Sequence, residues 1–198
     1  MSEYPAIEVT RKKGSESFLF ESRPLGFALR DFWQWAASDL TGNALRGVLA
    51  EYIVATALNK ADGVRTEWDA YDIRSAEGHK VEVKSAAHIQ SWQQKRPSPI
   101  RFNIRPTQGW NAATNEYSQE VKRQADIYVF AVLEHVDQQS VDPLNLNQWA
   151  FYVLRASKLN ELGSQKSIAL SSLRKLGPIE ASYGQIAAAV EREAQNGS

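Results

Sequence analysis

Cysteine is absent from this chain of 198 residues, and histidine occurs only three times. Without cysteine there can be no disulfide, no thiolate metal site and no cysteine nucleophile. Since no disulfide has to be maintained, a reducing cytoplasm is the expected location. The histidines (His79, His88, His135) are well separated in the sequence, which disfavours a zinc hydrolase. Neither a glycine-rich phosphate loop nor a Gly-x-Ser-x-Gly sequence is present, which disfavours nucleotide-binding and serine-hydrolase chemistry.

Long apolar runs are also missing. The longest, Ile127 to Leu133, is far too short to span a bilayer, and the first residues lack the basic and apolar regions of a signal peptide. We therefore expect no membrane association. The length, with 43% hydrophobic and 23% charged residues, is typical of one folded domain over residues 1–198.

Acidic residues are missing from one long stretch, Val83 to Asn115, although the chain as a whole carries 23 basic and 23 acidic side chains. The overall balance disfavours a protein that coats nucleic acid by bulk charge. The acid-free stretch carries only basic charges, and a positive segment directly after a group of carboxylates suits a phosphate-binding cleft. A basic loop that acids elsewhere in the fold neutralise is equally compatible with this pattern.

Residues 44–59 predict a helix with Asn43 as its N-cap, because apolar residues recur at helical spacing. The only charged residues in this helix are Arg46 and Glu51. Since so apolar a helix is expected to be covered on most sides, Glu51 needs a metal, a lysine or a backbone donor as its partner. Otherwise Glu51 lies at the rim of the apolar stripe and reaches water.

Two short strands joined by a Glu-Gly turn follow this helix, at Tyr71–Ser75 and Lys80–Ser85. Side chains alternate along a strand, so Glu82 and Lys84 should share one face while the two neighbouring valines share the other. The hairpin would bring a second carboxylate, Asp72, beside them. Two carboxylates and an ammonium group at a sheet edge suit a hard divalent cation and a water molecule.

The remaining pattern predicts a mixed α/β domain built around one sheet. Further strands are expected at 64–68, 101–105, 125–133 and 148–155, and helices at 27–37, 157–163, 172–176 and 182–195. The strand at 125–133 is apolar throughout and should be central and buried on both faces. These elements divide the domain into an N-terminal arm and helix (1–42), a core (43–133) and a C-terminal strand with helices (148–195).

The triplet Glu-Val-Lys occurs twice, so the triplet alone carries little information. The copy at 120–122 lies in a polar stretch with no expected strand or hairpin around it, and should be a solvated surface. The copy at 82–84 lies on a strand of period two, ten positions after Asp72 and downstream of the apolar helix that carries Glu51. A simple ion pair on an exposed sheet face, contributing about 0–1 kcal/mol, is the plainer interpretation of Glu82 and Lys84.

Taken together, Glu51, Asp72, Glu82 and Lys84 resemble the PD-(D/E)XK superfamily, the restriction-endonuclease-like nucleases. The resemblance covers roughly residues 43–133. It implies a restriction-endonuclease-like mixed central sheet flanked by helices, with an α-β-β-β-α-β core. It also implies a nuclease that uses Mg²⁺ or Mn²⁺.

On that pattern, Asp72, Glu82 and the backbone carbonyl of Val83 would bind the metal, with Glu51 as a further ligand, while Lys84 orients the attacking water. Asp69 competes with Asp72 for the role of the strand acid. The residue before Asp72 is tyrosine, where the superfamily pattern has proline.

Candidate contacts to nucleic acid lie mainly in the acid-free stretch: Gln90, Lys95, Arg96, Arg101, Asn103 and Arg105. The last three alternate on one face of the strand at 101–105 and form the best candidate for a strip along the nucleic-acid backbone. Trp92 and Trp110 are suited either to stacking on unpaired bases or to anchoring loops.

Three functions remain open at this point. The first is a divalent-metal-dependent nuclease acting on DNA, for which a homodimer would place two sites on a duplex. The second is a nuclease-fold module without catalytic activity that binds nucleic acid or a partner protein. The third is a structural α/β protein whose charges form a solvated sheet face, and fold likeness alone does not decide among them.

Overall fold

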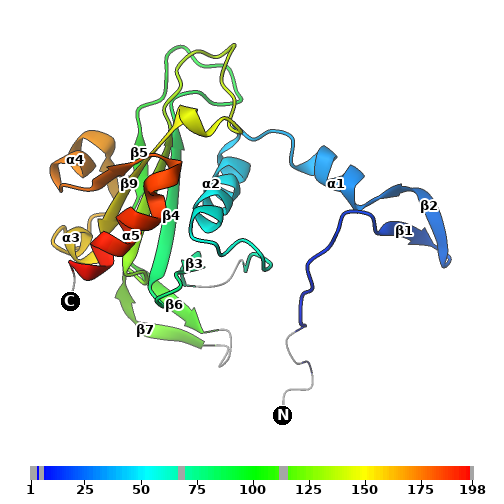
Figure 1. The fold of residues 1–198 in the computed structure, drawn as a ribbon, viewed down its shortest axis with the longest axis horizontal. Helices are drawn as coiled ribbons and strands as arrows, with labels where there is room; N and C mark the ends of the chain where they lie inside the picture. The colour runs from blue at the N-terminus through cyan, green and yellow to red at the C-terminus, as the bar shows by residue number, and fades with distance from the viewer. Residues whose placement is uncertain (1–3, 5–6, 67–69, 112–115, 197–198) are drawn as a thin grey trace.

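The computed structural model describes residues 4, 7–66, 70–111 and 116–196, and its centre is one five-stranded sheet (Figure 1). The strand order is β11-β9-β8-β4-β3, with bounds Ile73–Arg74 (β3), Lys80–Ala87 (β4), Ile127–Leu133 (β8), Trp149–Arg155 (β9) and Ile179–Ala181 (β11). Strands β4 and β8 run parallel and the other neighbours are antiparallel. The predicted mixed central sheet flanked by helices is therefore confirmed.

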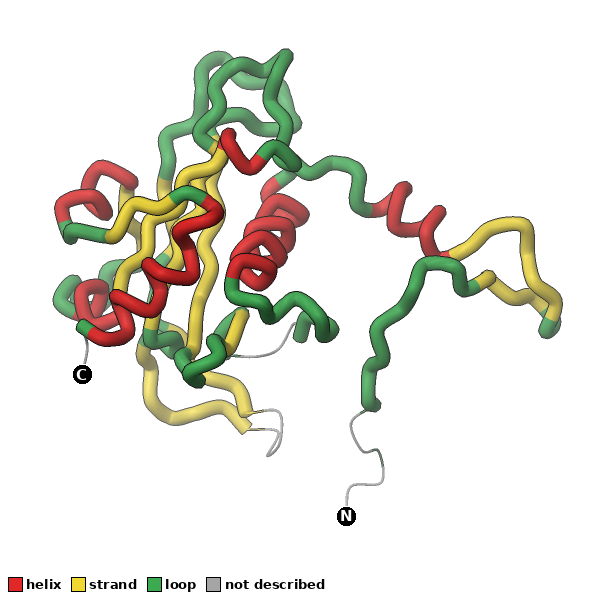
Figure 2. The backbone as a smooth tube through the Cα atoms, viewed as in Figure 1, coloured by secondary structure: helices red, strands yellow, loops and turns green. Residues whose placement is uncertain are grey.

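Apolar side chains fill both faces of this sheet, with the helices packed around it (Figure 2). Helices α2 (Asn43–Ala57) and α5 (Ile186–Gln195) contribute to the core on one face. The other face is covered by β5 (Arg101–Asn103), β10 (Ser167–Ala169), α3 (Ala156–Asn160) and α4 (Leu170–Lys175). Each face of the sheet thus belongs to its own hydrophobic cluster.

Strand β8 is central, and all seven of its residues are buried, as its apolar sequence predicts. Its alternate side chains serve the two clusters: Val129 packs on the α2 face, while Tyr128 and Phe130 pack on the opposite face. The same alternation holds in β4, where Val81 and Val83 face α2. The other face of β4 is therefore left to Glu82 and Lys84.

The connection from β4 to β8 differs from the expected core, which has a helix at this point. Among its described residues it carries strands and no helix: β5, then β6 (Thr107–Asn111) and β7 (Glu116–Lys122). Strand β5 pairs with β10 rather than joining the central sheet, and β6 and β7 form a separate hairpin. The strand expected at 64–68 is also not found, since residues 64–66 form a loop and the remainder lies outside the described residues.

Several element ends need correction. Gly42, not Asn43, is the N-cap of α2, because the Gly42 carbonyl accepts the first helical hydrogen bond, from the Arg46 N–H. The helix expected at 157–163 begins one residue earlier and ends sooner, since α3 spans Ala156–Asn160. A capping box precedes α5, in which the Ser182 N–H donates to the Gln185 side chain (2.9 Å).

The N-terminal segment forms an arm that stands away from the sheet (Figure 1). It consists of a hairpin, β1 (Ser17–Phe20) and β2 (Arg23–Ala28), and helix α1 (Leu29–Ala36), which confirms most of the helix expected at 27–37. Short 3-10 turns at Leu146–Gln148 and Tyr183–Gln185 complete the secondary structure. None of the helices in the described part of the chain has the length and apolarity needed to cross a membrane.

Candidate functional site

Asp72 lies where the edge strand β3 begins beside β4. Its backbone N–H donates to the Val81 carbonyl (3.1 Å), and its carboxylate accepts the Val83 N–H (2.7 Å). The carboxylate thus occupies the position of a backbone acceptor just beyond the paired part of β3. Because the N–H and C=O of one strand residue point to the same side, the Val83 carbonyl faces the same edge.

Glu82 and Lys84 share the opposite face from Val81 and Val83, as predicted. Their side chains form an ion pair and are only 19% and 31% exposed, respectively. Glu82 lies opposite Tyr128 in the parallel register between β4 and β8. The acid-x-lysine pair therefore sits above the sheet, with an aromatic hydroxyl from the neighbouring strand at its side.

The electrostatics centre on Asp72. The pKa of this carboxyl is raised from 3.8 to about 7, first by burial and then by the charges of Glu82 and Glu51, against the lowering effect of the Val83 N–H and of Lys84. Burial, and then the charge of Glu82, also raises the pKa of the Tyr128 hydroxyl. Negative charge at this edge of the sheet is therefore costly unless a cation compensates it.

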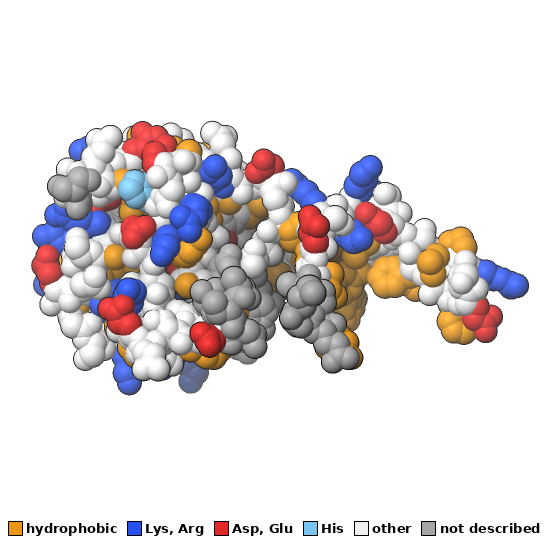
Figure 3. All heavy atoms as spheres, turned by 90° about the horizontal axis from the view of Figure 1, so that it is seen from below, with side chains coloured by type: hydrophobic (Ala, Val, Ile, Leu, Met, Phe, Trp, Pro, Cys, Tyr) orange, Lys and Arg blue, Asp and Glu red, His pale blue; other side chains and the backbone are white. Residues whose placement is uncertain are grey.

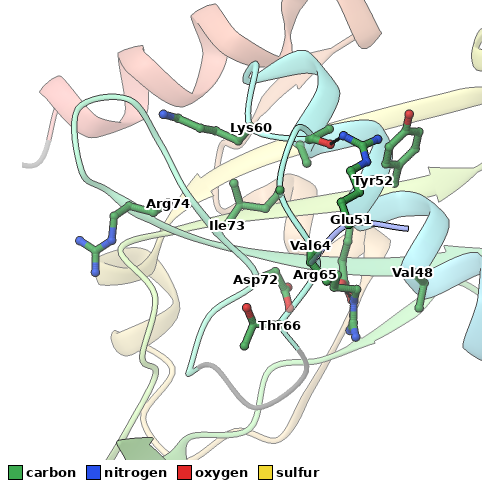
Figure 4. Close-up of a pocket in the computed structure, with 14 residues that line it drawn as sticks. Val48, Glu51, Tyr52, Lys60, Val64, Arg65, Thr66, Asp72, Ile73 and Arg74 are labelled. Carbon is green, nitrogen blue, oxygen red and sulfur yellow. Dashed lines mark hydrogen bonds and ion pairs between the residues drawn. The ribbon is translucent and has the colours of Figure 1, made fainter. Parts of the chain in front are cut away.

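Glu51 reaches the same region from α2. Its carboxylate is 17% exposed and is paired with Arg65, whose Nη2 donates to Oε1 at 3.1 Å. The partner is thus an arginine, where the sequence suggested a metal, a lysine or a backbone donor. Glu51 and Asp72 both line a cavity of about 430 Å³, one from the helix and one from the start of the edge strand (Figure 4).

A second, smaller hollow of about 100 Å³ lies on the Glu82 and Lys84 face. Asn103 and Arg105 line it together with that pair, and Tyr128 forms part of its wall. The strip predicted for the nucleic-acid backbone thus meets the acid-x-lysine pair in space. Asp72 lines the larger hollow and Glu82 lines the smaller one, and the charge of Glu82 is near enough to raise the pKa of Asp72.

The other predicted nucleic-acid contacts are dispersed. Lys95 and Arg96 are exposed, but their loop follows the carboxyl end of β4, at the end of the sheet opposite β3 (Figure 1). Arg101 is exposed and reaches Ser167 on β10 (3.3 Å). Gln90, which was expected among the contacts to nucleic acid, is instead buried. Its amide oxygen accepts from Arg46 (3.0 Å) and its amide nitrogen donates to the Ala87 carbonyl (2.9 Å).

Of the two tryptophans that were expected either to stack on bases or to anchor loops, one is exposed and one is packed within a hairpin. Trp92 is exposed on its loop, where an aromatic face is available to a ligand. Trp110 packs on Tyr117 across the β6–β7 hairpin, with 4.7 Å between ring centroids. Trp110 is therefore an anchor within that hairpin.

The second Glu-Val-Lys triplet provides an internal comparison. Contrary to expectation, it lies on a strand, β7, within a hairpin. Its predicted solvation is confirmed, since Glu120 and Lys122 are both more than half exposed and pair at 2.6 Å. The two triplets have the same sequence and both lie on strands. They differ in two respects: the side chains of Glu82 and Lys84 are less exposed, and Asp72 lies beside them.

Two residues of the site were not anticipated from the sequence. Tyr128 carries the only hydroxyl in an otherwise apolar strand, and this was an available signal. Arg65 follows α2 in a loop and offers no local pattern that would connect it with Glu51.

A metal site is not preassembled in this arrangement. Among the described residues there is no group of three histidine or acidic side chains in metal-binding geometry. Glu51 is turned to Arg65 and Glu82 to Lys84, while Asp69 lies outside the described residues. The donor set of Asp72, Glu82 and the Val83 carbonyl nevertheless consists of hard oxygen ligands of the kind that Mg²⁺ and Mn²⁺ prefer.

The fold and the convergence of acids at the sheet edge define an α/β protein of nuclease-like architecture. Residues 32–172 match the family model of bacteriophage T4 endonuclease IV, a span that includes α2, the β3–β4 hairpin and the residues that line the two hollows, except Arg11. The chain belongs to this family. A search of curated proteins finds no match.

Proposed function

We propose that this protein is a divalent-metal-dependent nuclease of the PD-(D/E)XK type that hydrolyses phosphodiester bonds in DNA. The observation that carries the proposal is the partly buried Asp72 carboxylate, which accepts the Val83 N–H, lies beside Glu82 and is costly to charge without a cation. Membership of the T4 endonuclease IV family supports nuclease activity and a DNA partner. The expected cytoplasmic location belongs to the same proposal.

The positions of the side chains support the following roles. Asp72, Glu82 and the Val83 carbonyl would hold Mg²⁺ or Mn²⁺, with Glu51 as a direct or water-mediated ligand. An ion bound there supplies a Lewis acid for the phosphate and a water molecule of lowered pKa. Lys84, released from Glu82, would donate a hydrogen bond to the attacking water and balance charge on the phosphate.

Cleavage is the direct test. Purified protein should nick plasmid DNA or cut single-stranded DNA with Mn²⁺ and not with EDTA. The double variant Glu82→Ala/Lys84→Ala should be inactive under both conditions. Cleavage that EDTA leaves unchanged would overturn the metal dependence, and cleavage retained by the double variant would overturn the site.

Metal binding should also be visible without any substrate. A ligand that binds only the folded state stabilises it by about 2.7 kcal/mol at 100 times its dissociation constant. Mn²⁺ should therefore raise the melting temperature of the wild type by several degrees. The Glu82→Ala variant should show little of this rise, because it lacks one of the two strand carboxylates.

The placement of the basic residues predicts a graded effect on DNA binding. Arg105→Ala should weaken binding and reduce the slope of log affinity against log salt by about 1, because Arg105 shares a hollow with Lys84. Lys95→Ala is the matched control, since Lys95 is an exposed cation at the other end of the sheet. Binding by filter retention or fluorescence anisotropy over a range of salt concentrations measures both. If Arg105→Ala and Lys95→Ala change DNA affinity equally, the DNA does not bind specifically at the smaller hollow.

A catalytically inactive module is the second candidate, and one observation favours it. Both Glu51 and Glu82 already have cationic partners, Arg65 and Lys84, which neutralise charge without a metal. This candidate predicts salt-dependent DNA binding with no effect of Mn²⁺ on the melting temperature. The melting experiment therefore separates the two functions before any cleavage is measured.

A further inference from the structure

The N-terminal arm exposes an unusual amount of apolar surface. Eight large hydrophobic side chains between residues 17 and 36 are exposed: Phe18, Leu19, Phe20, Leu25, Phe27, Phe32, Trp33 and Trp35. Figure 3 shows hydrophobic side chains along the arm where it projects from the body. No residue of α1 is buried, and every residue of β1 is exposed.

Internal contacts nevertheless give the arm a definite shape. Phe18 and Phe27 pack across the hairpin, with 4.9 Å between ring centroids. The Leu29 N–H donates to the Glu16 carbonyl (2.9 Å), which fixes the start of α1 beside the hairpin. Gly14 has a φ of +87°, and a Cβ there would come within 2.8 Å of the Trp33 ring, so glycine is required for this close approach.

The contacts within the hairpin and α1 are too few to stabilise the arm by themselves. A two-stranded hairpin is marginally stable in water, and a helix of eight residues is too short to persist alone. Both need an apolar surface to pack against, and among the described residues no element covers the exposed side chains of β1 and α1. The arm is therefore shaped for a partner that covers it.

The exposed area matches what a dimer needs. Taking about 200 Å² for a fully exposed aromatic side chain, the eight side chains leave roughly 800 Å² uncovered. This equals the roughly 800 Å² that each partner contributes to a standard interface.

The charge on the arm indicates the class of partner. Residues 17–36 carry two acids, Glu21 and Asp31, and two bases, Arg23 and Arg30, so they have none of the basic excess that a nucleic acid requires. The net charge of the whole chain is also zero, so there is no overall repulsion between two copies. A protein surface of the same composition is the complementary partner.

We propose that the arm is a homodimerisation element, whose hairpin and α1 pack against a second copy of this chain. Val48 and Tyr52 on α2 and Val64 in the following loop are also exposed, and they line the larger hollow together with Glu51 and Asp72, so the body offers apolar surface next to the candidate site. Dimerisation itself needs neither metal nor DNA, so it can be tested separately from the nuclease proposal.

Sedimentation equilibrium without DNA or divalent metal tests the proposal. The wild type should sediment with twice the mass of one chain, and Phe20→Glu/Trp35→Glu should raise the dissociation constant of the dimer by roughly 100-fold or more. These side chains are 66% and 84% exposed, so the variant should keep its circular dichroism spectrum. Trp92→Glu is the matched control, since Trp92 is 51% exposed but lies outside the arm, and it should remain dimeric.

A monomeric wild type at high micromolar concentration would overturn the proposal, and would indicate that the arm folds onto its own body or awaits a different protein. A dimer that survives Phe20→Glu/Trp35→Glu would also overturn it, since the interface would then lie elsewhere. If those substitutions reduce DNA affinity and leave the mass unchanged, the aromatic side chains serve as a DNA-contacting wedge instead.

Discussion

Lys84→Ala should reduce DNA cleavage by at least about 10²–10³-fold while leaving the fold unchanged. The ammonium group is positioned beside Glu82 on the face that carries the smaller hollow. Removing a single charge-stabilising donor from an active site typically costs this much in kcat. The ion pair itself is partly exposed and contributes only about 0–1 kcal/mol to stability.

The chain provides its own matched control in Lys122→Ala. Lys122 has the same two preceding residues, also lies on a strand, and also pairs with the glutamate two positions earlier. It differs in being well exposed and in lying on the separate β6–β7 hairpin. Initial cleavage rates on plasmid DNA, with melting temperatures of both variants, measure the contrast. If Lys84→Ala cleaves as fast as Lys122→Ala, Lys84 has no catalytic role.

The elements that the sequence predicts correctly are those with a clear local periodicity of apolar residues. The apolar spacing in α2, the alternation along β4 and the continuous apolar run of β8 each reflect burial of that element's own residues, so all three were found. Asp72, Glu82 and Lys84 come together for the same reason, because one short hairpin fixes their positions. Their mutual placement depends on only a few residues of intervening chain.

The errors concern pairings between distant parts of the chain. Strand β5 pairs with β10, some 66 residues later (Arg101 with Ala169, Asn103 with Ser167), so nothing local distinguishes it from a central strand. Gln90 is buried because Arg46 reaches it from α2. In α2, Arg46 rather than Glu51 is the buried charge. Its two Nη atoms donate to Gln90, to the Asn43 side chain and to the Thr41 carbonyl, while its Nε has no hydrogen-bond partner in the described part of the chain.

The two Glu-Val-Lys triplets show the limit of motif reading most directly. Both lie on strands in hairpins, so the backbone context that was expected to separate them does not. The separation comes from tertiary structure: β4 lies within the sheet beside β8, whereas β7 has only β6 as its neighbour. The site is therefore identified by the partly buried Asp72 carboxylate beside the triplet, and the triplet alone does not identify it.

Asp72→Asn should stabilise the metal-free protein near pH 8 while abolishing cleavage. In the unfolded chain the Asp72 carboxyl loses its proton near pH 3.8, whereas in the fold burial, together with the neighbouring carboxylates, raises its pKa to about 7. Between these values the unfolded state binds fewer protons than the folded state, so the free energy of unfolding falls as the pH rises from about 4 to about 7. Above that range the full cost is present, on the order of 4 kcal/mol.

Asparagine should remove this cost because it carries no charge and its amide oxygen can still accept the Val83 N–H. Urea unfolding of the wild type and the variant at pH 5, 6, 7 and 8 should therefore show a difference that grows with pH. Asp126→Asn is the control, since Asp126 also accepts a backbone N–H, from Lys80 (2.8 Å), but lies exposed. This variant should follow the wild-type pH dependence.

Excess Mn²⁺ should then reverse the order of stability. A cation held by Asp72 and Glu82 would compensate their charges, so the wild type should gain stability at pH 8 and Asp72→Asn should gain little. Loss of cleavage together with a gain in metal-free stability is the signature of a residue whose charge serves function at the expense of the fold. If Asp72→Asn is destabilised at every pH, the carboxylate is a structural cap for β4, and the metal site must be sought elsewhere.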